Sequence, residues 1–183
     1  MILGVDPKVD YAFKKVFGSE SHVWVLIDLL NAVLGSTIPE PITEVELRNP
    51  FNDKESLDDK LSIFDIKARD GSGRWYNIEM QMAAFEFYPK RVLYYWSRLY
   101  HQQLKEGIHY RELRPAISIS FVNGILLPGS SYHQEFGLVS RHDSGIVFCS
   151  DLSIHLIELP KFTHRSDNLT DSLEPFKMNF RST

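Results

Sequence analysis

The chain has 183 residues, of which 43% are hydrophobic and 24% are charged. This length supports one domain with a substantial core and is too short for two ordinary domains. The net charge of −4 argues against a large non-specific DNA-binding surface, which is usually basic, but it leaves room for a local basic patch.

The chain contains a single cysteine, Cys149, which excludes an intramolecular disulfide and a thiolate metal cluster. Charges appear too early in the N-terminal segment for a signal peptide, and no apolar run approaches the roughly 20 residues of a membrane-spanning helix. Neither a GxxxxGK[ST] loop nor HExxH spacing occurs, which argues against ATP and zinc sites. We therefore expect a cytoplasmic protein with no membrane partner and no small-molecule cofactor.

Hydrophobic periodicity predicts, in chain order, helices over residues 6–18 and 21–35, strands at 43–49, 61–68 and 75–82, a helix over 89–106, and strands at 115–127, 144–150 and 152–159. Asp6 and Ser21 are expected to cap the first two helices, and Gly107 to stop the third. This order is typical of the α/β class, with a mixed sheet covered by helices. We expect residues 1–160 to form the domain and residues 161–183 to form a polar C-terminal tail.

Two acidic residues lie on the hairpin formed by the second and third predicted strands. Side chains alternate between the faces of a strand, so the odd positions from Trp75 to Gln81 share one face, and the even positions form an apolar face. If residues 71–73 form the loop, facing residue numbers sum to 144. Asp65 then lies opposite Glu79.

Facing Cβ atoms lie about 5 Å apart, so two carboxylates in this position repel each other. A bound cation, protonation of one acid or a different register would each resolve the repulsion. Mg²⁺ binds one or two carboxylates with waters, and the main-chain carbonyl of Met80 could add a further ligand oxygen. The alternative is that Asp65 and Glu79 are solvated acids on an exposed face, and the pattern alone leaves both interpretations open.

A larger set of sequence blocks resembles a known nuclease family. The blocks, in order, are DYAFKKVFG, FDIKARDGSGRWYNIEMQ, RVLYYWSRLYHQQLKEGIHY, RPAISISFVNG and LSIHLIELPKF. They resemble the recombination-promoting nuclease and putative transposase family of the PD-(D/E)XK nuclease superfamily, from Asp10 to about Phe162. The resemblance implies a restriction-endonuclease-like core, with a central mixed β-sheet flanked by helices. It also implies Mg²⁺-dependent hydrolysis of DNA phosphodiester bonds, linked to recombination or transposition, with Mn²⁺ as a possible substitute.

The resemblance also implies roles for particular residues. Asp65 and Glu79 match the metal ligands of the motif, and Gln81 takes the place of its usual lysine. Asp10 on the first helix matches an acidic position that opens the N-terminal block of the family and is a further catalytic candidate. Arg91 and Tyr95 on the long helix match its R-x-x-x-Y positions near the active site. Because a glutamine carries no charge and is no base, Gln81 could only orient a water molecule by hydrogen bonds.

Several basic residues are candidates for the charge that Gln81 lacks or for contacts with DNA. Lys67 shares the face of Asp65 and is an outside candidate for that charge. Phosphate contacts are conceivable for Lys14, Lys15, Lys90, Arg98, Arg111 and Arg114, although most of these are expected to be ordinary solvated charges.

The family usually continues beyond the IELPKF block into a helical region, so the tail that ends at Thr183 is expected to be truncated. The first functional hypothesis is a metal-dependent DNA endonuclease, with a homodimer if both strands are cut. The alternative is a truncated, catalytically inactive relative that acts as a binding or regulatory module.

Overall fold

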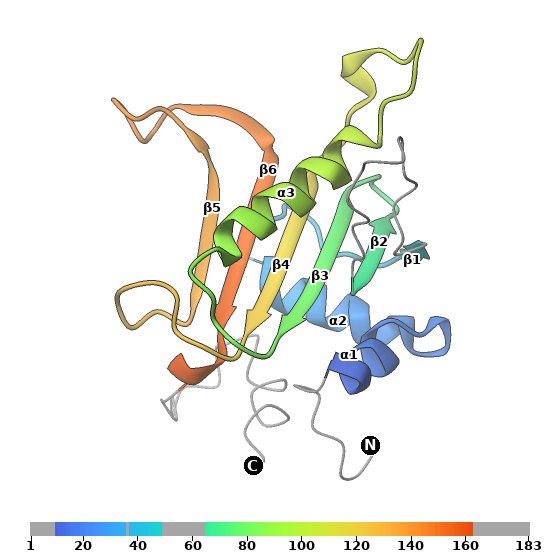
Figure 1. The fold of residues 1–183 in the computed structure, drawn as a ribbon. Helices are drawn as coiled ribbons and strands as arrows, with labels where there is room; N and C mark the ends of the chain where they lie inside the picture. Colours follow the sequence, from blue (N-terminus) through green and yellow to red (C-terminus); the bar gives the residue numbers. More distant parts are fainter. Residues whose placement is uncertain (1–9, 36, 49–64, 163–183) are drawn as a thin grey trace, which may run out of the picture.

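The computed structural model of the protein describes residues 10–35, 37–48 and 65–162 (Figure 1). Its elements in chain order are α1 (Asp10–Phe17), η1 (Glu20–His22), α2 (Val23–Leu34), β1 (Val45–Arg48), β2 (Ile66–Asp70), β3 (Trp75–Gln81), α3 (Tyr88–His101), η2 (Tyr110–Glu112), β4 (Ala116–Val122), β5 (His133–Val139), β6 (Val147–Glu158) and η3 (Leu159–Lys161). Some predictions concern residues outside the described ranges: the cap at Asp6, the start of the strand at 61–64 and the tail at 163–183.

Six strands form one sheet in the order β1-β2-β3-β4-β6-β5. The central strands β3, β4 and β6 run parallel, while β1, β2 and β5 join by antiparallel pairing. Figure 1 shows α3 crossing the front of the sheet, α2 behind it, and α1 at its lower end near β2 and β3. The predicted α/β class, with a mixed sheet flanked by helices, is confirmed. None of the described helices is long and apolar enough to cross a membrane.

The two faces of the sheet are packed differently. Behind the sheet, α2 buries five aliphatic side chains against the apolar face of β3: Leu26, Leu29, Leu30, Val33 and Leu34. Each contributes roughly 1.5–3 kcal/mol to folding by leaving water. The layer under α3 is smaller, and β3 presents the buried polar side chains of Asn77 and Glu79 to it. Most of the hydrophobic core therefore lies on one side, and the other side contains buried polar groups.

The hairpin between β2 and β3 has the register predicted from its turn. Ile66 pairs with Ile78 and Arg69 with Trp75, so facing residue numbers sum to 144. Gly73 adopts a φ of 89°, which an L side chain rarely adopts, and this glycine closes the turn. Asp65 immediately precedes β2, at the end of the sheet where β3 finishes.

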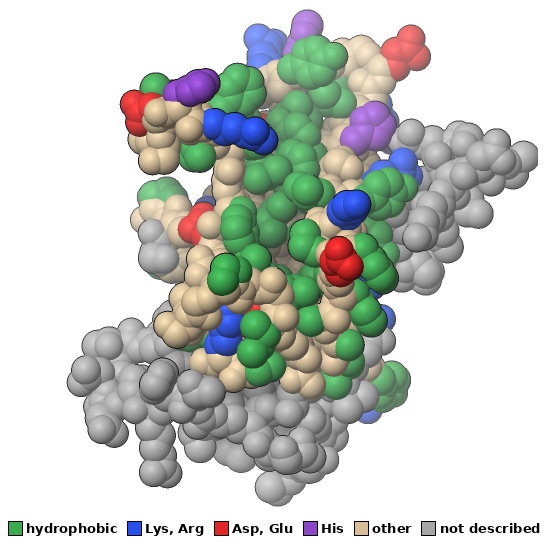
Figure 2. Space-filling view, turned by 60° about the vertical axis from the view of Figure 1, so that its left-hand side comes forward, with side chains coloured by type: hydrophobic (Ala, Val, Ile, Leu, Met, Phe, Trp, Pro, Cys, Tyr) green, Lys and Arg blue, Asp and Glu red, His purple; other side chains and the backbone are tan. Residues whose placement is uncertain are grey.

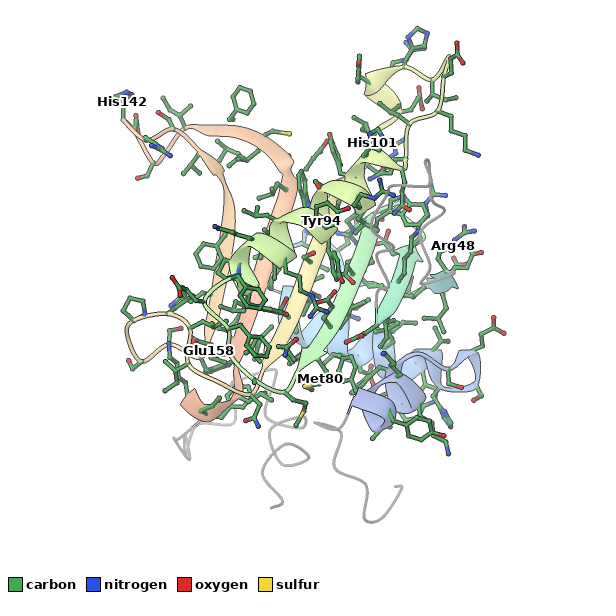
Figure 3. The ribbon with its side chains drawn as sticks, viewed as in Figure 1. Arg48, Met80, Tyr94, His101, His142 and Glu158 are labelled. Carbon is green, nitrogen blue, oxygen red and sulfur yellow. The ribbon has the colours of Figure 1, made fainter. Side chains whose placement is uncertain are left out.

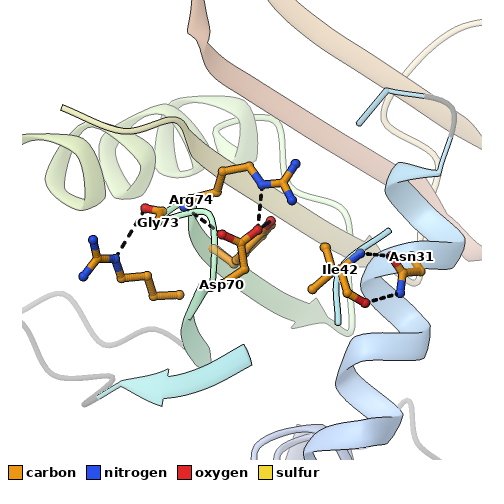
Figure 4. A network of polar contacts seen from close by, with 7 residues as sticks. Asn31, Ile42, Asp70, Gly73 and Arg74 are labelled. Atoms are coloured by element: carbon orange, nitrogen blue, oxygen red, sulfur yellow. Dashed lines mark hydrogen bonds and ion pairs between the residues drawn. The ribbon is translucent and has the colours of Figure 1, made fainter. Parts of the chain in front are cut away.

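A buried carboxylate stabilises the other end of this hairpin (Figure 4). Asp70 Oδ1 accepts the backbone N–H of Arg74 at 2.9 Å. Asp70 Oδ2 accepts bonds from Arg74 Nε and from the Tyr76 hydroxyl, both at 2.6 Å. Burial, reinforced by Asp70, raises the pKa of Tyr76, so its hydroxyl stays protonated and donates. The Asp70 cluster thus fixes the turn without any role at the opposite end of the strands.

We expect Asp70→Ala to lower the free energy of unfolding by about 3 kcal/mol, because it leaves the Arg74 guanidinium and the Tyr76 hydroxyl buried without their partner. Urea denaturation measures this loss. The control is Asp143→Ala, which removes an exposed aspartate that accepts only a local turn bond from Gly145, and it should cost under about 1 kcal/mol. Similar losses for the two variants would contradict the structural role of Asp70.

Some predicted boundaries were wrong. The long helix ends at His101 instead of Glu106, because the side chain of Gln103 exchanges hydrogen bonds with the backbone of Arg114 and ties the chain to the approach of β4. Ser21 does not cap α2. It lies inside the short helix η1, and its hydroxyl pairs with that of Ser19 at 2.7 Å.

The last part of the sheet also differs from the sequence prediction. The two strands expected over 144–150 and 152–159 are one strand, β6, and its partner β5 was not predicted. Beyond the part that pairs with β4, β6 continues with β5 as an arm. This arm carries exposed apolar side chains, among them Leu138, Val147 and Phe148. Figure 2 shows hydrophobic side chains running down the middle of the molecule, whereas basic, acidic and histidine side chains gather at the upper left.

Candidate active site

Four elements meet where β3 ends. Glu79 and Gln81 come from β3, Asp65 from the residue before β2, Lys14 from α1 and Arg91 from the first turns of α3. Figure 3 labels Met80 at this lower end of β3. Because β2 and β3 are antiparallel, the start of one and the end of the other lie at the same edge, which brings Asp65 to Glu79 although the residues are distant in sequence.

Glu79 is the most buried acid of this cluster, with 2% of its surface exposed. Its Oε1 accepts a bond from Asn77 Nδ2 at 3.3 Å, and its Oε2 lies 3.8 Å from Arg91 Nη2. Burial raises the pKa of Glu79 to about 7, Arg91 opposes the shift and the charge of Asp65 adds to it. The interpretation of Glu79 as a solvated surface acid is therefore wrong, and a nearby cation would favour its ionised form.

Asp65 is held in place by the backbone and by a lysine. Its Oδ2 accepts the N–H of Met80 at 2.9 Å, which joins it to β3. Its Oδ1 lies 3.1 Å from Lys14 Nζ, and Lys14 also lowers the pKa of Glu79. The sequence had placed Lys14 only among possible phosphate contacts. The neighbouring residue Phe13 is fully buried against the core. A hydrophobic residue next to Lys14 was therefore the only signal in the sequence that Lys14 lies near the sheet.

Arg91 connects Gln81 to α3. Its Nη1 donates to Gln81 Oε1 at 3.3 Å, and its guanidinium lies over the ring of Tyr95 at 5.1 Å from the centroid. The structure thus brings together Glu79, Gln81 and Arg91, with Tyr95 beneath the arginine. The ring beneath it, the hydrogen bond to Gln81 and the ion pair with Glu79 together hold the guanidinium in one orientation.

Lys67, a candidate from the sequence, does not join this cluster. Lys67 donates to Gln102 Oε1 at 2.8 Å and lies over the ring of Trp75, near the C-terminal end of α3. Its ammonium is engaged there and does not replace the charge that Gln81 lacks. Asp10 begins α1, but its side chain lies outside what the structure describes.

In a scan against protein-family models, residues 7–179 match the PD-(D/E)XK nuclease family transposase model. The chain belongs to this family. Searches of curated proteins and of solved structures found no match. Membership in the family supports a nuclease of the hydrolase class, with DNA as the substrate class suggested by the family.

Nucleases of the PD-(D/E)XK type generally use divalent metals, and the residues at the end of β3 fit such an ion. Asp65 and Glu79 supply two carboxylates, and the carbonyl of Met80 lies between Glu79 and Gln81. Asn77 Oδ1 and Arg91 Nε are buried there with no hydrogen-bond partner among the described residues, as expected beside a hydrated ligand. Within residues 10–35, 37–48 and 65–162, no three His, Cys, Asp or Glu side chains gather as a metal site. Two carboxylates with water ligands suit Mg²⁺ better than zinc.

Proposed function

We propose that this protein is an Mg²⁺-dependent DNA endonuclease, active also with Mn²⁺, that hydrolyses phosphodiester bonds in recombination or transposition. The observation that carries the proposal is the joining of a desolvated glutamate, an aspartate, a lysine and an arginine at one end of β3. Carboxylates that repel each other favour a cation between them, and the two basic side chains suit an anionic substrate.

Each residue has a role that follows from its contacts. Asp65 and Glu79, with the carbonyl of Met80, would hold the ion, which when bound polarises the phosphate and lowers the pKa of a water. Arg91, fixed on Tyr95, would bind a phosphate oxygen through its guanidinium. Because Gln81 Oε1 accepts from Arg91, its amide nitrogen can donate to the attacking water or to the phosphate. Lys14 would supply the positive charge that Gln81 does not carry.

The test is cleavage of supercoiled plasmid DNA. We expect nicked or linear product with Mg²⁺ or Mn²⁺ and none with EDTA. Asp65→Ala and Glu79→Ala should each abolish the product while circular dichroism shows the fold retained. Cleavage that persists in both variants would exclude this site as the source of the activity.

The plasmid assay, together with calorimetry, distinguishes the nuclease from the alternative function. If the purified chain is folded, binds no Mg²⁺ by calorimetry and cuts no DNA, it is an inactive relative that acts as a binding or regulatory module. Asn77 Oδ1 and Arg91 Nε are buried without a hydrogen-bond partner among the described residues, which favours the active site over this alternative.

Double-strand cleavage would require two sites on opposite strands, so we also propose a homodimer for that reaction. Sedimentation equilibrium of the metal-free protein, with and without DNA, tests it. A monomer on DNA that still gives linear product in one encounter would contradict the dimer.

A further inference from the structure

A hollow lined by aromatic and basic side chains lies beside the candidate active site. It has a volume of about 580 Å³ and is formed by Phe87, Lys90, Arg91, Tyr94 and Tyr95. All five residues lie between Phe87, which precedes α3, and Tyr95 in the middle of that helix. Arg91 belongs both to this hollow and to the cluster around Glu79 and Gln81, so the two sites are continuous.

The rings of this hollow are exposed, which needs an explanation in a small domain. Phe87 is 62% exposed and Tyr94 40% exposed. Phe87 stacks on Phe85, with centroids 5.4 Å apart and planes inclined by 7°, and both rings stay partly exposed. Tyr94 lies 6.1 Å from the ring of Tyr95, which supports Arg91. Apolar rings beside cations bind ligands that are both planar and anionic.

We propose that this hollow binds unpaired nucleotides, and that the substrate of the site is single-stranded or locally unpaired DNA. The proposal rests on the nuclease function proposed above and names its substrate class. In intact duplex the base faces are covered by neighbouring bases, whereas unpaired bases can stack on exposed rings. Phe87 and Tyr94 would stack bases, and Lys90 would bind the backbone on the way to Arg91.

The experiment measures binding, apart from cleavage. A fluorescein-labelled 15-nucleotide single strand and a hairpin duplex of matched composition are titrated with the Glu79→Gln protein in EDTA at fixed salt. We expect the single strand to bind at least about ten times more tightly, because two bases can stack and each contributes a factor of about five or more. Failure of the nuclease proposal would appear in the plasmid assay and leave this result unchanged.

Substitutions of Phe87 and Tyr94 test whether their rings stack on the bases. Phe87→Leu and Tyr94→Leu, made in the same background, should each weaken single-strand binding about five-fold or more and change duplex binding little. Phe87→Trp and Tyr94→Phe should retain the affinity, since each keeps an aromatic face. The control is Tyr110→Leu, which removes an aromatic side chain that is 83% exposed on η2, outside the hollow.

Several results would overturn the proposal. These are equal or tighter binding of the duplex, leucine variants that bind as the parent does, or an equal loss from Tyr110→Leu. The proposal also fails if the protein is a dimer that the Phe87→Leu substitution dissociates and if it shows no preference for single-stranded DNA. A second copy of the chain would then be the occupant of this surface.

Discussion

Replacing Glu79 with glutamine is expected to slow DNA cleavage by about 10³-fold or more while leaving the fold intact. Glutamine keeps the size of the side chain and removes the charge that a metal ligand needs. Charge stabilisation by a bound ion amounts to several kcal/mol in the transition state, and each 1.36 kcal/mol corresponds to a factor of ten in rate. Single-turnover cleavage of a plasmid at saturating Mg²⁺ measures the loss.

The same substitution should stabilise the metal-free protein at alkaline pH. The folded-state pKa of Glu79 is raised from 4.5 to about 7, so the glutamate disfavours folding increasingly as pH rises through this range. At pH 8, Glu79→Gln should gain up to about 3 kcal/mol in unfolding free energy, and at pH 4 it should gain nothing. Urea denaturation in EDTA at the two pH values tests the sign.

The control for both effects is Glu86→Gln, which changes an exposed glutamate in the segment between β3 and α3. It should alter neither the cleavage rate nor the pH dependence of stability. A Glu79→Gln protein that cuts at the parent rate would remove Glu79 from the reaction. If the Glu79→Gln protein is less stable than the parent at pH 8, burial of the ionised Glu79 does not destabilise the fold as predicted.

The β2–β3 hairpin was predicted correctly from the sequence because its geometry depends on residues that are close together in the chain. Alternation fixes which side chains share a face, and the residues Gly71 to Gly73 fix the turn, so the register followed from residue numbers alone. The apolar face of β3 required a layer behind it, which α1 and α2 supply. The resemblance to the nuclease family then indicated Asp65, Glu79 and Gln81 as the site.

The sequence could not predict features that depend on distant contacts. β5 lies at the edge of the sheet, and its residues are half-buried or exposed, so no alternation marks it. The contact of Lys14 with Asp65 joins α1 to a position 51 residues further along the chain, and it arises because α1 packs against the end of β3. Two adjacent lysines in sequence give no indication of which one faces a carboxylate.

Lys14→Gln is expected to lower cleavage on the order of 10²-fold, a smaller loss than that expected from removing either carboxylate. Its ammonium lies 3.1 Å from Asp65 Oδ1 and favours the ionised form of Glu79. A positive charge fixed where negative charge develops on the phosphate typically contributes this much. The matched control is Lys15→Gln on the same helix, because Lys15 is exposed and its ammonium lies 6.0 Å from the centroid of the Tyr11 ring, outside the cluster.

A second measurement distinguishes this role from a simpler one. If Lys14 only occupies the place of the cation in the metal-free protein, its removal should tighten Mg²⁺ binding in calorimetry and leave the cleavage rate unchanged. If it supplies the charge that Gln81 lacks, the cleavage rate should fall even at saturating Mg²⁺. Gln81→Lys in the Lys14→Gln background should then restore part of the rate, because it returns a cation to the strand beside Glu79. Failure of that rescue, with tighter metal binding, would assign Lys14 to the first role.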